Sequence, residues 1–458
     1  MSRAVAVLLG VVLVCSAALH ARQAANPTTD YQSADEKSYG HLAIGLAEHL
    51  RYGDGGQGGL HWPPGAPVLF AVAQRIAPGA TDAKAVSIGA AYWLQALVSL
   101  GTAVAACVLA WALAGRWAGV LAAALVGLYP PLIMFTGEQL SEPLGAFLVT
   151  AALAALALRH RSRFALPAAG ALFGLAVLTR ADLILAPIVV GLLAGAWIAF
   201  RRKRPRHGVR FAVIFLGAAG LVVFPWVIYA STRADRFIPV TSGSSVALFV
   251  GTYLPGDGTT FGMKRALGAE TKRTHPKLRD KTDLQLSSRA VFDVIAARHP
   301  ELPRDEAIQR EARRNLTRYG LGQPFAFAGM MGSKAVRMWS RYARGGARHT
   351  STPLRVYHVV LVVGSLAGLL AGLWRRREPL LAIVLAVVLY STALHALVVS
   401  QGRYNLPLIP ALIAAGVAGW FLAPRPRARA AGDEPATLQE WNSDRSASGA
   451  AAAPAPSN

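Results

Sequence analysis

The sequence predicts an all-α polytopic membrane protein with about ten transmembrane helices and amphipathic helices on the outer side of the membrane. The composition is the first observation: of 458 residues, 53% are hydrophobic and 16% are charged, with a mean hydropathy of +0.38. Soluble globular chains carry about a quarter charged residues, so these charges are too few to cover a water-facing surface. In addition, the apolar residues form runs long enough to cross a bilayer, and short basic clusters separate these runs.

Each predicted span is an apolar run close to the length of about 20 residues that crosses a bilayer. In chain order the spans cover residues 4–20, 88–113, 117–134, 139–158, 164–180, 184–200, 211–230, 355–374, 379–400 and 405–423. The first is either an uncleaved anchor or a signal peptide cut at the small residues that begin at Ser16. The anchor is favoured because it fits the parity of ten spans. Residues 63–78 begin with two prolines and are too short to span, so they predict an interfacial or re-entrant helix.

The basic residues predict the orientation of the spans, because Lys and Arg remain in cytoplasmic loops. The run from Arg201 to Arg210 is the strongest marker of an inside loop. Residues 1–423 then form a multi-pass domain of the cytoplasmic (inner) membrane, with a long outer segment at about 231–354. That segment is basic, but long loops translocate largely regardless of charge. Residues 424–458, rich in Ala, Pro, Ser and Gly, predict a disordered cytoplasmic tail.

Charge and motifs exclude several other function classes. The formal net charge of +23 is divided among the loops and does not form one patch, so nucleic-acid binding is not indicated. The two cysteines, Cys15 and Cys107, lie in apolar runs, which excludes a disulfide framework or a cysteine-based metal site. No HExxH motif, P-loop or dinucleotide-binding glycine motif occurs in the sequence.

The outer segment predicts two amphipathic helices. The first begins near Pro303 and repeats apolar residues at helical spacing as far as Leu316. Gly320 ends this helix, and an amphipathic run from Phe325 to Trp339 follows. We expect these helices to lie against the membrane-embedded core and not to form a separate enzyme domain.

Ionisable residues beside the apolar spans are the candidates for chemistry, because burying such groups without a function is costly. The predicted topology brings one group of polar residues to the outer face, although its members come from distant parts of the chain. The group consists of Asp35, Glu36, His61, Glu138, Glu142, Arg180, Asp182, Arg403 and Tyr404. Their convergence on one face predicts a site there.

Each candidate also has a purely structural interpretation. Asp35 and Glu142 stand where a carboxylate favours a helix N-terminus. Arg180 and Asp182 are close enough in sequence to pair only with each other, and Arg403 suits an interfacial anchor. A surface histidine is the commoner interpretation of His61 than a metal ligand. The residues alone leave these alternatives open.

Four short stretches occur in order between residue 30 and about residue 420. They are Asp35-Glu36 followed by Pro63-Pro64-Gly65, Tyr129-Pro130 leading to Ser141-Glu142-Pro143, Leu178-Thr179-Arg180, and Arg403-Tyr404 with Pro407 and Pro410. Together they resemble the membrane-embedded glycosyltransferases of the C superfamily. The bacterial branch with protein O-mannosyltransferases, aminoarabinose transferases and Rgt-type lipopolysaccharide-core transferases is the most similar group.

This resemblance implies an enzyme that takes a sugar from a polyprenyl phosphate and transfers it outside the cytoplasm. The acceptor would be an envelope glycolipid or polysaccharide, with a protein less favoured. Asp35 would be the catalytic base with Glu36 beside it, since a carboxylate can take the proton of an attacking hydroxyl. Arg403 and Arg180 would bind the donor phosphate. The expected supporting residues are Glu138, Glu142, Asp182, Tyr404 and His61.

Several features of the expected reaction are left open by the sequence. A divalent cation such as Mg or Mn near Asp35 is compatible with the residues but not required by them. A secondary transporter or lipid flippase is the alternative function, and a non-catalytic scaffold is a third. Transporters place polar groups near the bilayer midplane and contain internal repeats, whereas here the ionisable residues favour one face. Neither the sugar nor the acceptor follows from the sequence.

Overall fold

The computed structural model describes residues 2–27, 34–53, 60–77, 88–342 and 351–423. These residues form helices and turns, with no strand among them, so the all-α class is confirmed. The chain divides into two units, Met1–Leu422 and Ala423–Asn458, and the description below concerns the first. The predicted tail at 424–458 lies outside the described residues.

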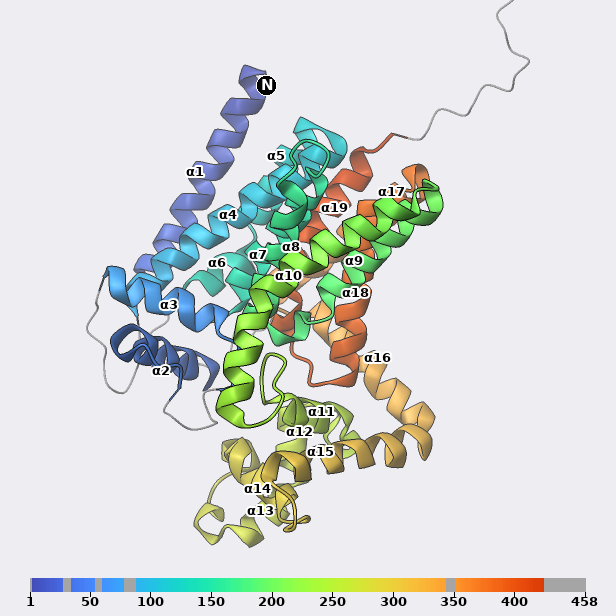
Figure 1. Cartoon of the computed structure of the whole chain (residues 1–458). Coiled ribbons are helices and arrows are strands. Elements are labelled where there is room, and N and C mark those ends of the chain that lie inside the picture. Colours follow the sequence, from blue (N-terminus) through green and yellow to red (C-terminus); the bar gives the residue numbers. More distant parts are fainter. Residues whose placement is uncertain (1, 28–33, 54–59, 78–87, 343–350, 424–458) are drawn as a thin grey trace, which may run out of the picture. The chain divides into compact units, whose positions relative to one another are not determined.

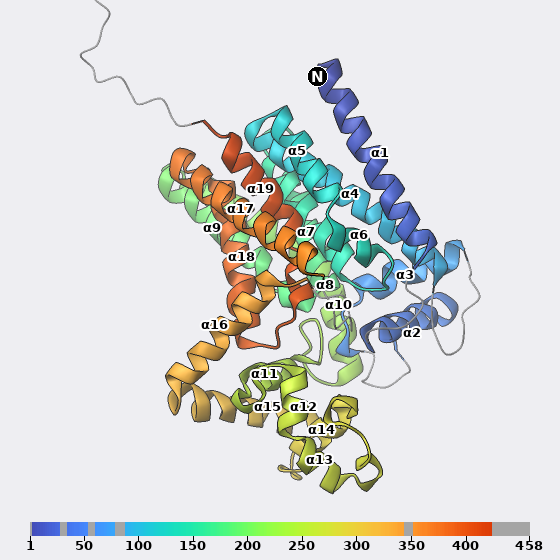
Figure 2. The ribbon, with the colours of Figure 1, turned by 180° about the vertical axis from the view of Figure 1, so that it is seen from behind.

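The apolar helices of the first unit form a bundle (Figures 1 and 2). In chain order they are α1 (Arg3–Ala25), α4 (Gly89–Ala114), α5 (Arg116–Gly127), α6 (Pro130–Thr136), α7 (Glu142–Ala157), α8 (Ala165–Thr179), α9 (Ala186–Ala196), α10 (Pro205–Ala234), α17 (Thr352–Arg376), α18 (Pro379–Leu397) and α19 (Ile409–Phe421). Two further helices, α2 (Ala34–His49) and α3 (Gly65–Ile76), lie beside one end of the bundle. The predicted short helix at residues 63–78 is therefore present as α3.

Apolar helices occupy all ten predicted spans, but their lengths do not establish ten crossings. Of the described helices, six are long and apolar enough to cross a membrane, or seven if the α5–α6 pair, bent by 52°, is one span. The helices α7, α8 and α19 have only 16, 15 and 13 residues. The helices α7 and α19 begin, and α8 ends, beside the polar cluster described below. The count of ten stays a prediction.

The helix α10 has a largely exposed apolar surface. Of its most apolar stretch of 18 residues, only 17% is buried inside the protein. Its exposed side chains include Val213, Leu221 and Phe224. A surface of this kind promotes aggregation in water but is the normal lipid-facing side of a membrane span. The chain is therefore a multi-pass membrane protein.

The centre of the bundle is α19, which packs against α17, α4 and α5. Every residue from Ile409 to Gly419 is buried. Small residues allow the close approach: a Cβ on Gly368 of α17 would collide with the backbone oxygen of Gly416. Close backbone contact through small residues is the usual way in which transmembrane helices associate.

The first helix, α1, is packed into the bundle against α4 and α5. The Ser16 hydroxyl donates a hydrogen bond to the backbone oxygen of Gly127 at 2.9 Å. The His20 ring nitrogen Nδ1 lies 2.7 Å from the Thr136 hydroxyl. Whether this helix is an uncleaved anchor stays a prediction.

The outer segment contains both predicted amphipathic helices, as α15 (Arg304–Asn315) and α16 (Pro324–Ser340). Before them come α11 (Ser244–Thr252), α12 (Thr260–Ala266), α13 (Gly268–Thr274) and α14 (Ser288–Ala296). We call residues 241–315 the cap. Phe249, Met263, Val291 and Ile308 belong to its own small core. Both α11 and α16 pack against α18, so the outer segment lies against the bundle, as expected.

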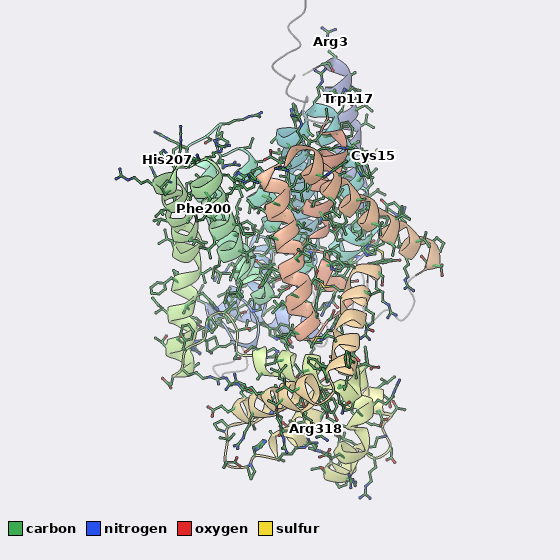
Figure 3. All side chains as sticks on the ribbon, turned by 90° about the vertical axis from the view of Figure 1, so that its right-hand side faces the viewer. Arg3, Cys15, Trp117, Phe200, His207 and Arg318 are labelled. Atoms are coloured by element: carbon green, nitrogen blue, oxygen red, sulfur yellow. The ribbon has the colours of Figure 1, made fainter. Side chains whose placement is uncertain are left out.

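The cap and the basic run lie at opposite ends of the bundle. Figure 3 shows Arg3 and His207 at one end and Arg318, which follows the cap, at the other. The cap also gathers below the ends of α10 and α18 in Figure 1. This separation is the arrangement that the distribution of basic residues predicts.

Replacing Gly368 by Ala should destabilise the bundle by about 1–3 kcal/mol, because the added methyl group collides with the backbone of α19. Gly364 of the same helix has no atom within 4 Å of a Cβ position. Gly364→Ala is therefore the matched control. Thermal unfolding in detergent should show a lower Tm for Gly368→Ala only, and equal Tm values would contradict the packing.

Candidate active site

A cavity of about 520 Å³ lies where the ends of the bundle helices meet the cap. Its polar lining comes from widely separated parts of the chain. Outside the cap, the polar residues are Asp35 and Tyr39 of α2, His61 and Trp62 before α3, Ser141 and Glu142 at the start of α7, Thr179 at the end of α8, Arg180 and Asp182 after it, Tyr390 and His395 of α18, and Gln401, Arg403 and Tyr404 before α19. The topology predicted this convergence from distant segments.

Helix ends place the central residues. Glu142 is the first residue of α7 and is followed by Pro143, which suits the first turn because it needs no N–H partner. At Arg180 the backbone leaves α8 in an extended conformation, with φ −143° and ψ 109°. Arg403 lies in a short 3-10 turn, η8 (Gly402–Asn405), between α18 and α19. Three breaks in apolar helices thus bring three charged side chains together.

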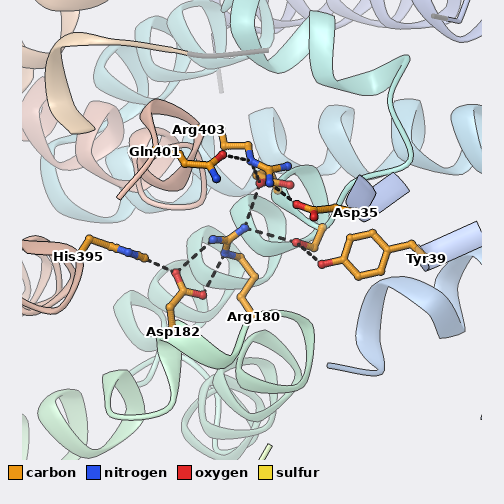
Figure 4. A network of polar contacts seen from close by, with 9 residues as sticks. Asp35, Tyr39, Arg180, Asp182, His395, Gln401 and Arg403 are labelled. Carbon is orange, nitrogen blue, oxygen red and sulfur yellow. Dashed lines mark hydrogen bonds and ion pairs between the residues drawn. The ribbon is translucent and has the colours of Figure 1, made fainter. Parts of the chain in front are cut away.

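Arg180 is bound on both sides of its guanidinium group (Figure 4). Nε and Nη2 donate to the two carboxylate oxygens of Asp182, each at 3.2 Å. Nη1 donates to the Ser141 hydroxyl at 3.3 Å and lies 3.2 Å from Glu142 Oε1. The paired hydrogen bonds to Asp182 fix the plane of the guanidinium group.

Arg403 makes a second set of contacts in the same network (Figure 4). Its Nη2 donates to Asp35 Oδ2, and its Nε donates to Gln401 Oε1 at 3.1 Å. The same Nε lies 3.5 Å from Glu142 Oε1, so this oxygen contacts both arginines. Burial opposes the charge of Arg403, but Glu142 and Asp35 hold its pKa well above the ordinary value. The guanidinium group therefore stays charged.

Three aromatic side chains, Tyr404, His395 and Tyr390, lie beside Arg180 and Asp182 in the cavity lining. The Tyr404 ring lies 5.4 Å from the Arg180 guanidinium carbon and 5.6 Å from that of Arg403. His395 Nε2 lies 3.0 Å from Asp182 Oδ2, and the Tyr390 hydroxyl donates to the Asp182 backbone oxygen at 2.6 Å. Rings beside guanidinium groups attract the cations and exclude water.

Sequence reasoning gave no site role to several residues of this network, among them Ser141, Tyr390, His395 and Gln401. One of them carried a usable signal. His395 is an ionisable side chain inside an apolar helix, a position that marks function in membrane proteins. The other three are uncharged, and their order in the sequence does not distinguish them from other polar residues near helix ends.

Most predicted site residues line the cavity, but Glu36 and Glu138 do not. Glu36 is buried next to Asp35 on α2, where successive side chains point about 100° apart. Glu138 is also buried, and its backbone oxygen accepts a hydrogen bond from Gln95 of α4. Both residues lie next to segments that line the cavity, but neither is itself part of the lining. The catalytic and binding roles of the residues in the cavity stay predictions.

The carboxylates of the cavity do not form a complete metal site. Within the described ranges, no group of three or more His, Cys, Asp or Glu side chains is arranged to hold a metal ion. Asp35 and Glu142 both contact Arg403, so a guanidinium group is shared by the two candidate ligands. We therefore derive no step that passes through a metal ion.

The turn that carries Arg403 is held from behind by α16. Asn405 Nδ2 donates to the backbone oxygens of Met338 at 2.6 Å and Arg341 at 3.2 Å. Lys334 is fully buried, and its Nζ donates to the backbone oxygens of Gly251 at 2.8 Å and Ala396 at 2.6 Å. One lysine thus joins the last turns of α11 and α18. Burial, with Arg337 nearby, lowers the pKa of Lys334 to about 7.

Lys334→Met should destabilise the protein by about 1–3 kcal/mol, because two buried carbonyl groups lose their donor. The loss should depend on pH. The folded-state pKa of about 7 lies below the ordinary value of 10.5, so the unfolded chain binds more protons between these values. The free energy of unfolding contributed by this lysine therefore rises as the pH rises from about 7, and is constant below.

Thermal unfolding at several pH values above neutrality tests this prediction. The variant should lack the part of the pH dependence that wild type owes to Lys334. Lys277→Met, at an exposed position, should behave like wild type. The same pH dependence in all three proteins would contradict the buried charge.

No protein-family model matches this sequence, and no curated protein matches it in a sequence comparison. Solved structures do. The oligosaccharyltransferase AglB from Archaeoglobus fulgidus, in complex with an inhibitory peptide and a dolichol-phosphate, is similar with a TM-score of 0.52 and 16% identity. The similarity covers 98% of this chain and 52% of that one. The apo form of the same enzyme has a TM-score of 0.52 and 16% identity, and the similarity covers 98% of this chain and 53% of that one.

The chain thus spans about half the length of the oligosaccharyltransferase it matches. ArnT from Cupriavidus metallidurans bound to undecaprenyl phosphate is also similar, at 16% identity over 91% of this chain and 77% of that one, but its TM-score is only 0.37. Agreement at the level of the fold therefore rests on AglB. Over the part that they share, this chain and the archaeal oligosaccharyltransferase have the same overall fold.

Proposed function

We propose that this protein is a glycosyltransferase that moves a sugar from a polyprenyl phosphate to a cell-envelope acceptor, a glycolipid or polysaccharide. The observation that carries the proposal is the pair of buried guanidinium groups, held by three carboxylates in a cavity at the end of a membrane bundle. A polyprenyl phosphate has an anionic head on an apolar chain and suits such a cavity. The AglB structure with the same fold is described with a dolichol-phosphate.

Asp35 is the proposed catalytic base. Its side chain is 23% exposed, compared with 2% for Glu142 and 16% for Asp182, so it is the most accessible of the three carboxylates. In the reaction, the acceptor hydroxyl oxygen forms a bond to the anomeric carbon while Asp35 takes the hydroxyl proton. The bond from that carbon to the phosphate oxygen breaks, and the phosphate leaves with the electron pair.

Arg403 and Arg180 are the proposed phosphate-binding groups. Negative charge develops on the leaving phosphate, and fixed cations in a site that excludes water stabilise such charge. Glu142 contacts both guanidinium groups through Oε1 and so sets their separation. Positioning them before the donor arrives avoids reorganisation during the reaction.

An apolar part of the lining gives the lipid chain a place. Ile184, Leu394 and Val398 line the cavity beside the arginines. They come from the segments around α9 and α18, whose outer surfaces include exposed apolar side chains such as Leu192 and Leu389. A polyprenyl chain leaving the cavity here would pass from apolar protein surface to apolar lipid without crossing water.

The side of the membrane is part of the proposal. The cavity lies at the cap end of the bundle, opposite Arg3 and the basic run, as Figure 3 indicates for the two ends. If the basic run is cytoplasmic, the reaction takes place on the extracytoplasmic face of the inner membrane.

Asp35→Asn should abolish transfer, with a loss of at least roughly 100-fold, because the amide cannot accept the hydroxyl proton. Mass spectrometry of lipid-linked monosaccharides and envelope glycans should show the donor accumulating and one glycan losing a sugar. Asp280→Asn, at an exposed carboxylate of the cap, is the matched control. Normal glycans in Asp35→Asn cells would remove this mechanism, and ion-gradient-driven substrate uptake in vesicles would favour a transporter.

Arg403→Lys should weaken binding of undecaprenyl phosphate by about tenfold, since an ammonium group cannot reproduce a planar fork that reaches several partners at once. Arg313→Lys makes the same change at an exposed position of α15 and should leave affinity unchanged. Titration of the purified protein in nanodiscs measures both dissociation constants. Equal affinity in Arg403→Lys and wild type would exclude Arg403 from the phosphate site.

A further inference from the structure

The cavity has two walls of opposite character. All of its charged lining residues, Asp35, Glu142, Arg180, Asp182 and Arg403, come from outside the cap. The part of the lining that the cap contributes carries no charged residue. Its polar members are Thr241, Ser244, Thr260 and Ser288, which we call the hydroxyl wall.

The cap does contain charged residues, and several of them pair with one another. Lys272 lies 2.8 Å from Asp283, and Arg304 lies 2.7 Å from Asp293. Arg298 lies 2.8 Å from a carboxylate oxygen of Glu270. None of these residues belongs to the cavity lining. The cap therefore contains charged residues, but none of them belongs to the hydroxyl wall.

The hydroxyl groups of this wall have no hydrogen-bonding role in holding the fold: within the ranges that the structure describes, Thr241, Ser244, Thr260 and Ser288 make no side-chain hydrogen bond. Helix capping is performed instead by the preceding residue: Thr259 Oγ1 accepts from the Gly262 N–H at 3.0 Å, and Ser287 Oγ accepts from the Ala290 N–H at 3.1 Å. In each doublet, the first hydroxyl caps a helix and the second faces the cavity.

The imidazole ring of His61 is a further uncharged polar group beside the wall. His61 packs against Gly243, where a Cβ would collide with the imidazole ring. Burial lowers the pKa of His61 below its ordinary value, so the ring is uncharged at neutral pH. An uncharged imidazole offers one hydrogen-bond donor and one acceptor, as a hydroxyl group does.

We propose that the hydroxyl wall binds the sugar of the donor lipid and that this sugar is an uncharged hexose or pentose. The inference rests on the proposed function and names its substrate class. Uncharged hydroxyl groups donate and accept and so match the hydroxyl groups of a neutral sugar. An amino sugar or a uronic acid would face this wall with a charge that no cap residue of the lining compensates, which is unfavourable in a partly enclosed site.

The test compares binding of undecaprenyl phosphate with binding of the same lipid carrying glucose, glucuronic acid or glucosamine. Wild-type protein in nanodiscs should bind the glucose-bearing lipid more tightly than the bare lipid and the two charged conjugates. Thr260→Ala and Ser288→Ala should each reduce the advantage of glucose over the bare lipid by roughly three- to tenfold, as loss of one hydrogen bond implies. Affinity for the bare lipid should not change.

The adjacent capping residues provide matched controls. Thr259→Ala and Ser287→Ala make the same kind of change at the preceding residue, whose hydroxyl group caps a helix. These variants should lower the Tm but keep the full advantage of glucose. This pattern separates a binding role of the wall from a general loss of stability.

The possible failures are distinguishable. If wild type binds bare undecaprenyl phosphate but Thr260→Ala and Ser288→Ala keep the glucose advantage, the hydroxyl wall does not bind the sugar. Preference for a charged conjugate would overturn the neutral substrate class. If wild type does not bind bare undecaprenyl phosphate, the proposed function itself fails, and this inference fails with it.

Discussion

The site depends on one electrostatic constraint: two guanidinium groups are buried at the end of an apolar bundle. Breaking a buried ion pair by removing one partner destabilises proteins by about 3–5 kcal/mol, because the remaining charge has left water without compensation. Glu142 satisfies this constraint by contacting both Arg180 and Arg403 through one oxygen. Asp182 and Asp35 each bind one of the two arginines. The helix breaks before α7, after α8 and before α19 make this arrangement possible.

The membrane class and the rough position of the site were predictable because they depend on properties that add along the chain. Apolar runs specify the helices, and basic residues specify which ends share a side of the membrane. This was enough to bring Asp35 near Arg403. It did not give the rotation of each helix about its axis, which is set by packing. Glu36 and Glu138 therefore lie near cavity residues in sequence but do not line the cavity, and Gln401 was overlooked.

Under the proposed role of the hydroxyl wall, one helical segment serves both stability and recognition. Doublets of hydroxyl residues stand at the starts of α12 and α14, and in each doublet the local backbone needs only the first member. The second member projects from a rigid position without being consumed by the fold. Meanwhile Lys334 joins α11 of the cap to α18 of the bundle. One buried side chain thus links the cap to the bundle.

The contact between Arg403 and Asp35 also bears on how the protein is made. These residues are separated by 368 positions along the chain. During synthesis, Asp35 emerges and its helix settles long before the ribosome reaches Arg403. Until the final apolar helix is inserted, the network around Glu142 lacks one of its two cations. A chain whose last apolar helix is not inserted therefore lacks the complete network. The site can form only after that helix is in place.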